Sequence, residues 1–309
     1  MLFNSLQILI VPQIKFKKNN FFKMAPRTED WNLIIEPKGS LFRLNLREVW
    51  KYKDLLEMYI KRDIVTFYKQ TVLGPLWFFI QPIFTTIVFM FVFGSIAGIP
   101  TDGIPQPLFY LSGICLWNYF SDSLTKTSDT FYTNQAVFGK VYFPRLIVPL
   151  SVTISGLLKM LIQFSLFAGV YIYFAAKGTT VAINSYALLF PLLIFILAGL
   201  GLGFGIIISS MTTKYRDLKF LLAFAIQLWM YFTPVIYPLS VMEGNYKKYM
   251  WLIQANPLTA VLETFKYGFL GKGSFSWLAL GYSTVFTLVL LLVGTWIFNR
   301  VERSFMDVV

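Results

Sequence analysis

The sequence of 309 residues contains no histidine, only one cysteine (Cys115), and charged residues at only 14% of its positions. The lack of histidine excludes Ser-His-Asp and Cys-His catalytic arrangements, most zinc sites and the most common general base. A single cysteine excludes an intramolecular disulfide and any metal site with several cysteine ligands. We therefore expect no catalytic residue, no metal and no cofactor bound by this chain.

Charge is scarce because the chain is mainly apolar, with 56% hydrophobic residues and a mean hydropathy of +0.62. Soluble domains carry about 25% charged residues. One helix needs about 20 apolar residues to cross a bilayer. The sequence therefore predicts an all-α integral membrane protein with six transmembrane helices, at about residues 76–97, 105–128, 146–176, 184–211, 219–239 and 275–299.

The 27 Lys and Arg residues are divided unequally between the two sides of this map. Twenty-one lie before the first span, in the loops after the second and fourth spans, or in the C-terminal tail, whereas five lie on the opposite side and Lys159 lies within a span. Because cytoplasmic loops are enriched in Lys and Arg, both termini are predicted to be cytoplasmic. The net charge of +12 follows the membrane, so we expect membrane lipids, and no nucleic acid, as partners.

The N-terminal region is interpreted in two parts. Residues 1–38 are predicted to be a cytoplasmic extension, because their apolar start is short, broken by proline and followed rather than preceded by basic residues, unlike a signal peptide. Residues 39–70 are predicted to contain an amphipathic helix capped by Ser40. A helix packed on a soluble core is the alternative, but the sequence indicates no such core nearby. We therefore expect a helix in the membrane interface, before a transmembrane domain at 71–309.

The segment 122–145 is the longest predicted cytoplasmic loop, and it contains five aromatic residues between Phe131 and Phe143. A simple connection would be shorter. We favour a docking surface for a cytoplasmic partner, and the alternative is packing against the protein's own helices.

The fourth span contains the sequence GLGLGFG, from Gly199 to Gly205. It is not a dinucleotide-binding loop, because GxGxxG would require glycine at Phe204 and no strand precedes it. Glycines four residues apart let two helices approach closely. Gly199 with Gly203, and Gly201 with Gly205, therefore predict helix packing.

Two prolines, Pro234 and Pro238, interrupt the end of the fifth span in the sequence YFTPVIYP. A proline inside a helix removes one backbone hydrogen bond and clashes with the preceding turn. Segment 249–262 is too short to cross the membrane, and Asn256-Pro257 predicts a helix that starts at Pro257 with Asn256 as its cap. We therefore predict short re-entrant helices on the outer side and interpret this irregular backbone as an exit gate.

Taken in order, the N-terminal helix, the six spans, YFTPVIYP and NPLTAVLETFKYGFLG resemble the membrane subunit of type-2 ABC exporters. The similarity is greatest to the permeases that export O-antigen, capsule or teichoic-acid polymers. RDIVTFYKQTVLGPLWFFIQP, from Arg62 to Pro82, also resembles the start of that family's first span, and the resemblance covers about residues 40–305.

This resemblance implies a homodimer in the bacterial inner membrane that works with a separate nucleotide-binding ATPase subunit. The ATPase would carry ATP and Mg²⁺, and the substrate would be an undecaprenyl-diphosphate-linked polysaccharide that leaves the cytoplasm. In agreement, the chain contains no GxxxxGK[ST] loop with which to hold ATP phosphates itself.

The resemblance also implies roles for two groups of residues. Contacts that couple the permease to the ATPase would be made by Phe42, Leu46, Trp50, Gln135, Phe138, Lys140, Pro144 and Arg145. The outer gate would include Pro234, Pro238, Asn256, Pro257 and Glu263.

Aromatic rings stack on the CH faces of sugars, so aromatic residues of the second span and the following loop are candidates to line a polymer channel. These residues are Trp117, Tyr119, Phe120 and Tyr132. The alternative is a lipid-facing or interfacial position, which is common for Trp and Tyr in membrane proteins.

Three basic residues and one amide complete the predicted pathway. Lys159, with Gln163 one turn later, is predicted to line the channel, because a lysine is costly in hydrocarbon. A lysine that snorkels to a nearby inner surface is the alternative. Lys61 and Arg62 are predicted to bind the lipid diphosphate, for which ordinary attraction to anionic headgroups is the alternative.

Other functional classes are disfavoured by specific absences. A secondary transporter would carry intramembrane carboxylates for ion coupling, but the first and the third to sixth spans contain no Asp or Glu. A membrane-embedded enzyme would need acid–base residues, and the spans contain no histidine. Within the exporter family, export of a lipid, a drug or another small molecule remains the alternative.

Overall fold

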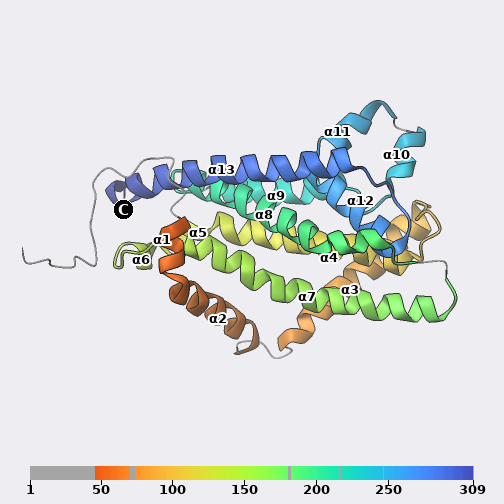
Figure 1. Ribbon diagram of the computed structural model, residues 1–309, viewed down its shortest axis with the longest axis horizontal. Helices are drawn as coiled ribbons and strands as arrows, with labels where there is room; N and C mark the ends of the chain where they lie inside the picture. Colours follow the sequence, from red (N-terminus) through yellow and green to blue (C-terminus); the bar gives the residue numbers. More distant parts are fainter. Residues whose placement is uncertain (1–45, 70–73, 180–181, 216, 246, 309) are drawn as a thin grey trace, which may run out of the picture. The chain divides into compact units, whose positions relative to one another are not determined.

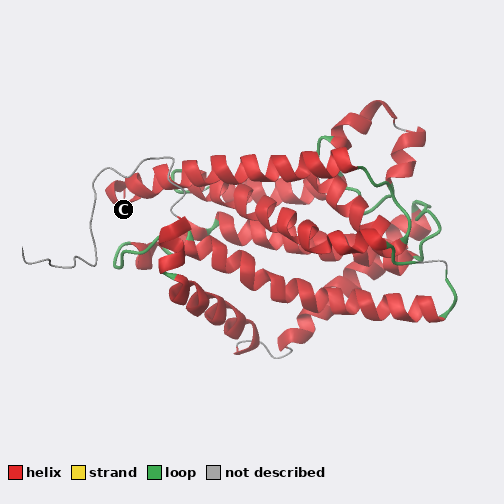
Figure 2. Cartoon of the chain, in the orientation of Figure 1, coloured by secondary structure: helices red, strands yellow, loops and turns green. Residues whose placement is uncertain are grey.

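The computed structural model describes residues 46–69, 74–179, 182–215, 217–245 and 247–308, which belong to one compact unit, Ser40–Val309. Figure 2 shows that the regular elements in these ranges are helices, with no strand among them. The predicted cap Ser40 and the coupling residue Phe42 lie outside the described residues. In chain order (Figure 1) the helices are α1 Leu46–Lys51, α2 Lys53–Lys69, η1 Gly74–Leu76, α3 Trp77–Phe89, η2 Met90–Ile96, α4 Gln106–Ser128, α5 Thr130–Thr133, α6 Gln135–Phe138, α7 Ile147–Ala176, η3 Ser185–Leu189, α8 Phe190–Thr212, α9 Leu218–Tyr231, α10 Leu239–Asn245, η4 Lys247–Tyr249, α11 Met250–Gln254, α12 Pro257–Leu270 and α13 Trp277–Val308.

Among the described residues, four helical stretches are long and apolar enough to cross a membrane: Gly74–Ile96, Ile147–Ala176, Ser185–Thr212 and Trp277–Glu302. They coincide with the predicted first, third, fourth and sixth spans to within a few residues. The other two predicted spans fall on α4 and α9. α4 has 23 residues but carries Asp122 and Lys126, and α9 has 14 residues, about 21 Å at 1.5 Å per residue.

α9 ends eight residues before the predicted end of the fifth span at position 239. The cause is Pro234, because its nitrogen cannot donate to the carbonyl of Met230 and because the residue before a proline avoids the helical region. The last turn tightens instead: the amides of Phe232 and Thr233 bond the carbonyls three residues back, at 3.1 and 3.2 Å. The predicted break is thus confirmed, and it begins earlier than expected.

α4 lies at the centre of the helical arrangement and packs against α3, α7 and α8. Most of its side chains from Leu108 to Phe120 are buried, and they form the main core together with residues of α7, α8 and α12. Polar side chains on α4 bond to its neighbours, as shown by Ser123 Oγ, 3.2 Å from Thr153 Oγ1 of α7. The hydroxyl residues of α4, such as Ser123 and Thr127, are therefore inside the protein, whereas Asp122 is half-buried and Lys126 is exposed.

The glycines of α8 alternate between two helices. A Cβ added to Gly201 would lie 2.8 Å from Ser123 of α4, and one added to Gly205 would lie 2.5 Å from Thr127. Gly199 and Gly203 face α13 in the same way, where an added Cβ would overlap Thr287 and Leu290, respectively. The two overlapping glycine pairs thus have the packing role that the sequence predicted, and each pair serves a different neighbour.

A second core, which we call the Phe138 cluster, joins the N-terminal helices to the rest of the chain. It consists of Val49, Tyr59, Phe131, Phe138, Phe143, Leu146, Ile147, Val148, Leu202, Ile206 and Phe298. Val49 lies on α1 and Tyr59 on α2, and α2 packs along α7 (Figure 1). The expectation that no core is available near the N-terminal helix was wrong, because Phe131, Phe138 and Phe143 of the 122–145 loop turn inward and help to form one.

Candidate functional site

The backbone from Phe232 to Leu239, which we call the Pro234 segment, is buried from Thr233 onward although it belongs to no helix before Leu239. The amide of Val235 bonds the carbonyl of Thr233 at 2.6 Å, which makes a tight turn around Pro234. Val235 also packs on α4 at Gly113, where an added Cβ would lie 3.1 Å from the Cα of Val235. Buried backbone outside regular structure needs hydrogen-bond partners, and neighbouring elements supply them.

Asn256 connects the Pro234 segment to the start of α12. Its Oδ1 accepts a bond from the amide of Leu258 at 3.1 Å, which is the predicted cap of a helix that begins at Pro257. Its Nδ2 donates to Thr233 Oγ1 at 2.9 Å and to the carbonyl of Phe232 at 3.3 Å. The predicted capping residue therefore has a second role, since one amide side chain starts α12 and holds the end of α9.

A buried charged pair lies further along α12. Lys266 and Glu263 are 2% and 3% exposed, and their Nζ and Oε1 atoms are 3.5 Å apart. Lys266 Nζ also donates to the carbonyl of Pro234 at 2.6 Å and lies 4.1 Å from the ring centroid of Phe109 on α4. Glu263 Oε2 accepts a bond from the amide of Ser274 at 3.1 Å. The pair therefore links α12 to the Pro234 segment, to α4 and to the α12–α13 turn.

Lys266 was not predicted as a site residue from the sequence, where it counts as one of the cations of an outer loop. A signal was available, because Glu263 and Lys266 are the only charged residues of an otherwise apolar helix and stand three positions apart. The bond to Pro234, 32 residues away, was not visible in any local pattern.

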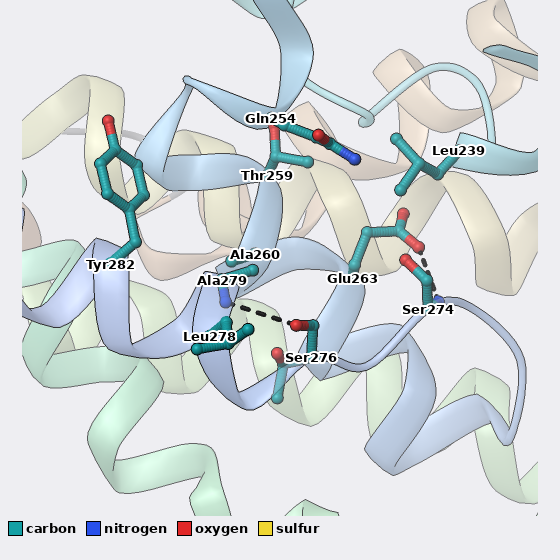
Figure 3. A pocket seen from close by; sticks show the side chains of 11 residues that line it. Leu239, Gln254, Thr259, Ala260, Glu263, Ser274, Ser276, Leu278, Ala279 and Tyr282 are labelled. Carbon is teal, nitrogen blue, oxygen red and sulfur yellow. Dashed lines mark hydrogen bonds between the residues drawn. The ribbon is translucent and has the colours of Figure 1, made fainter. Parts of the chain in front are cut away.

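A cavity of about 460 Å³ opens beside Glu263 (Figure 3). Its wall is formed by α11, α12, the α12–α13 turn and the start of α13, and it is lined by Leu239, Gln254, Thr259, Ala260, Glu263, Thr264, Ser274, Ser276, Leu278, Ala279 and Tyr282. The lining combines a carboxylate with several hydroxyl groups. Leu239, at the end of the Pro234 segment, borders the same cavity, so the segment and the cavity share a wall.

The loop before α4 completes this outer region. Asp102 adopts a positive φ of 52°, which non-glycine residues seldom do. Its carboxylate accepts bonds from Ser240 Oγ of α10 at 2.8 and 3.0 Å. Pro238 stands directly before α10 and is buried. The residues of the predicted gate therefore gather around one irregular stretch of backbone.

The predicted ATPase-coupling residues whose burial the structure describes form three groups, which are exposed, half-buried and buried. Trp50 and Lys140 are exposed, as is Tyr142 of the same loop, with Trp50 at 76% and Tyr142 at 75%. Gln135, at the start of α6, and Pro144 are half-buried. One part of the 122–145 loop builds the Phe138 cluster, as the packing alternative expected, and another part is exposed. For the exposed residues the docking surface stays a prediction. Leu46 begins α1.

Phe138 and Arg145 are structural residues in this conformation. Phe138 is 1% exposed within the cluster named after it, and Arg145 is 7% exposed. Arg145 Nη1 donates to the carbonyl of Glu302 at 2.7 Å, and Arg145 Nε lies 3.8 Å from Glu302 Oε1. Burial lowers the pKa of Arg145, while the carboxylate of Glu302 opposes this shift. A charge reversal at Arg145 would therefore disturb the fold as well as any contact with a partner.

Both residues predicted to bind the lipid diphosphate have acidic neighbours. Lys61 Nζ lies 3.3 Å from Glu57 Oε1, one turn earlier on α2. Arg62 Nη2 lies 2.8 Å from Asp63 Oδ1, and the guanidinium stands 4.3 Å from the ring centroid of Tyr59. Both basic side chains are exposed. An anion that binds here would have to compete with these carboxylates.

Three of the four aromatic residues predicted to line a channel are buried within this chain. Trp117, Tyr119 and Phe120 are 5%, 3% and 0% exposed, and the hydroxyl of Tyr119 donates to the carbonyl of Thr153 at 3.2 Å. In this conformation these rings face other helices of the chain and not open space. Their channel-lining role stays a prediction, and it would require α4 to separate from its neighbours.

Tyr132 differs from these rings, since it is 57% exposed. Lys219 of α9 lies with its Nζ 3.5 Å from the ring centroid of Tyr132 and 2.6 Å from Asp129 Oδ1. The first turn of α9 is thereby attached to the loop after α4.

Lys159 of α7 forms an ion pair with Asp122 of α4 at 2.5 Å. Its Nζ also lies 5.7 Å from the ring centroid of Phe78, the second residue of α3. Lys159 is therefore level with the start of the first span, and this position favours the alternative of a lysine near one membrane surface. Gln163, which was predicted to line the channel with Lys159, is 1% exposed, so its channel-lining role stays a prediction. The described residues contain no group of three His, Cys, Asp or Glu side chains that could hold a metal ion.

The comparisons with known proteins agree on the class of this chain. The family model of the ABC-2 type transporter matches residues 55–270. The chain is 27% identical to the O-antigen export system permease protein RfbA of Klebsiella pneumoniae, over 82% of this chain and 95% of that protein. It is 24% identical to RfbA of Myxococcus xanthus, over 72% and 82%, and 25% identical to the polysialic acid transport protein KpsM of Escherichia coli, over 82% and 95%.

The matched residues run from α2 to the end of α12. They include the 122–145 loop, the first three of the four apolar stretches and the whole Pro234 segment. Most of the helical architecture described above thus lies within the match. The chain belongs to the ABC-2 type transporter family.

Proposed function

We propose that this chain is the transmembrane subunit of an ATP-driven exporter that moves an undecaprenyl-diphosphate-linked, O-antigen-like polysaccharide out of the cytoplasm. The observation that carries the proposal is the match to O-antigen export permeases over 95% of their length. The match to KpsM, a polysialic acid transport protein, supports a polymer as the substrate. Export of a lipid, a drug or another small molecule by the same architecture is the alternative.

The energy for export comes from a separate nucleotide-binding subunit in this proposal. The sequence supports this division, because it has no GxxxxGK[ST] loop. ATP and Mg²⁺ are assigned to the partner. The proposed docking surface consists of the exposed residues Trp50, Lys140 and Tyr142. In the sequence each of them stands within two positions of a residue of the Phe138 cluster. Large exposed aromatic side chains are typical of a protein interface.

The membrane topology proposed here has six spans in the bacterial inner membrane, with both termini cytoplasmic. α4 forms the second span, and its charged residues lie near its inner end. α9 together with the Pro234 segment forms the fifth span, since the helix alone is shorter than the hydrocarbon core of about 30 Å. α10, α11 and α12 then form the outer hairpin before the last span, with α2 at the inner interface.

The polymer passes between two copies of the chain in this proposal. A passage must adjoin both the docking surface and the outer gate, and α9 reaches from Lys219, beside the loop after α4, to the Pro234 segment. Apolar side chains along α9 are exposed in the single chain, with Phe220 at 83% and Phe224 at 59%. We therefore assign α9, with the exposed face of α3, to the surface between the copies.

Lys61 and Arg62 are proposed to receive the lipid diphosphate, in exchange for their present carboxylate neighbours. Phosphate oxygens match the bidentate geometry of a guanidinium, so Arg62 is the stronger candidate.

A deletion strain tests the proposed substrate class. Loss of the gene should cause a lipid-linked polymer to accumulate in the cytoplasm, and expression of the intact chain with its ATPase should restore export. Surface polymer and cytoplasmic polymer are measured in parallel by immunoblotting and by sugar analysis. If the deletion strain carries normal surface polymer and no cytoplasmic excess, the alternative of a small-molecule exporter replaces the polymer proposal.

A further inference from the structure

Lys266 is the most deeply buried cation among the described residues, and Glu263 is the only other charged residue of its helix. Three groups surround its ammonium: the carbonyl oxygen of Pro234 at 2.6 Å, the carboxylate of Glu263 at 3.5 Å and the ring centroid of Phe109 at 4.1 Å. The shortest of these contacts is to the backbone carbonyl and not to the carboxylate. The position of the ammonium is therefore set by the Pro234 segment.

The carbonyl of Pro234 needs this donor. The helix has ended at Tyr231, and the segment around Pro234 forms no further helical turn that could supply an amide. A buried carbonyl without a donor is costly, and a charged donor makes a stronger bond than a neutral one. Because α12 provides the donor, the segment and the helix are held together by one side chain.

We infer that Lys266 is the positioning residue that keeps the Pro234 segment closed against α4, and that Glu263 serves to compensate its charge. Breaking the bond between Lys266 and Pro234 frees the segment from α12 while α9 itself stays folded. The inference rests on the proposed function only where it concerns export. Whether the Pro234 segment is closed can be measured without any transported substrate.

Cysteine labelling measures this closure directly. The chain has one cysteine, Cys115, which is 2% exposed and can be replaced by alanine to give a cysteine-free background. Ile236 in the segment is 3% exposed, so Ile236→Cys reacts with a membrane-impermeant maleimide only when the segment opens. Trp251→Cys on α11, at a position that is 67% exposed, reports that the outer side is accessible to the reagent in every variant.

Three substitutions separate the positioning role from simple charge balance. Lys266→Met removes the donor to Pro234 and should accelerate the labelling of the cysteine introduced at position 236 about tenfold, the effect of losing one charge-assisted hydrogen bond. Glu263→Gln keeps the donor to Pro234 but removes the compensating charge, so its labelling rate should lie between that of Lys266→Met and that of the reference, which is Ile236→Cys in the cysteine-free background. The double variant Glu263→Gln/Lys266→Met removes both buried charges but still lacks the donor, so it should label as fast as Lys266→Met.

A purely structural charge pair gives the opposite pattern. Either single substitution would then leave one uncompensated buried charge and label fast, while the double variant would return to the reference rate. That pattern, or an unchanged rate in the double variant, overturns the inference. The double variant decides the question even if Lys266→Met fails to fold, because it leaves no unpaired buried charge.

Lys272→Met is the matched control, since Lys272 is an exposed lysine in the following turn. It should label at the reference rate, and an acceleration there equal to that of Lys266→Met would also contradict the inference. If the variants label at the rates expected above but the chain exports no polymer, the positioning role of Lys266 is supported and only the proposed function is contradicted.

Discussion

Among the individual residues, two buried cations have the same function in distant parts of the chain. Arg145 donates to the backbone carbonyl of Glu302, 157 positions away, and Lys266 donates to that of Pro234. Each cation also has a carboxylate nearby, at a longer distance than the carbonyl. Charged side chains in this mainly apolar protein thus attach separate segments to each other, because a buried charge is tolerated only with such partners.

Arg145 and its neighbour Lys140 should therefore respond differently to the same charge reversal. Arg145→Glu places a carboxylate beside Glu302 and should destabilise the protein by about 3–5 kcal/mol, the range for breaking a buried pair. Lys140→Glu changes an exposed residue and should leave the melting temperature within about 1 °C, since surface substitutions change stability by less than about 0.5 kcal/mol. Thermal unfolding of the detergent-purified variants measures both effects.

The Lys140→Glu variant also tests the docking surface. Lys140→Glu should lower the polymer export and the copurification of the ATPase while the permease remains stable. Normal export by this variant, at normal expression, would place the ATPase contact elsewhere on the exposed surface.

Among the secondary-structure elements, α8 is held between α4 and α13 by glycines that face alternate sides. Gly205→Ala would bring a methyl group to 2.5 Å from Thr127 Cβ, so α4 and α8 must move apart. We expect a loss of about 1–3 kcal/mol, the usual cost of overpacking. Gly281→Ala in α13 is the control, because nothing lies within 4 Å of the added Cβ.

The control should be neutral or slightly stabilising, since alanine is favoured over glycine in a helix by about 1 kcal/mol. Thermal unfolding in one detergent compares the two variants. Equal melting temperatures for Gly205→Ala and the unsubstituted protein would show that the α4–α8 contact can relax without cost.

The break after α9 leads to a second prediction about an element. Replacing Pro234 and Pro238 by alanine restores two backbone donors and removes the clash, a helical gain of about 3 kcal/mol per interior proline. We expect α9 to extend beyond Tyr231, which would withdraw the carbonyl of residue 234 from Lys266 and displace Val235 from Gly113.

The double variant should be folded and bind the proposed ATPase, but export should be lost or the pore should leak small ions. Liposome flux assays and surface polymer measure these outcomes. If the double variant exports polymer at the normal rate and its pore does not leak ions at rest, the break after α9 is only a packing kink and not part of a gate.

For the molecule as a whole, the exposed apolar surface of the spans has to be covered either by lipid or by a second copy. Only 11% of the most apolar window of Gly74–Ile96 is buried within the chain, against 61% for Ser185–Thr212. In the proposed six-span topology one copy offers too little wall for a glycan channel, so we expect a homodimer whose copies meet at α3 and α9.

Site-directed crosslinking tests this assembly in native membranes. In the cysteine-free background, Phe224→Cys on α9 should give a dimer with a short bismaleimide. Val285→Cys on α13 has a similar exposure, 60% against 59%, and should remain monomeric because α13 is not part of the surface that we assign to the contact between the copies. Monomer alone at both positions, in membranes and in detergent, would contradict the assembly.

Features that depend on neighbours a few positions away could be predicted from the amino-acid sequence. The cap at Asn256, the helix that begins at Pro257, the break near Pro234 and the packing role of the glycines of α8 all follow from local chemistry. The limits of four apolar stretches follow from the length that a bilayer requires. Each of these depends on backbone geometry or on composition within one helix, so no distant residue is needed.

Which residues meet across the chain could be learned only from the folded protein. In a chain of this kind lipid is as apolar as the protein core, so hydrophobic periodicity cannot distinguish a lipid-facing residue from a buried one. For this reason Phe138 and Tyr142 looked alike in the sequence, although one is buried and the other is exposed. The bond from Lys266 to Pro234 needed the chain to turn back on itself, because the charge of a lysine is local but the carbonyl that it satisfies is not.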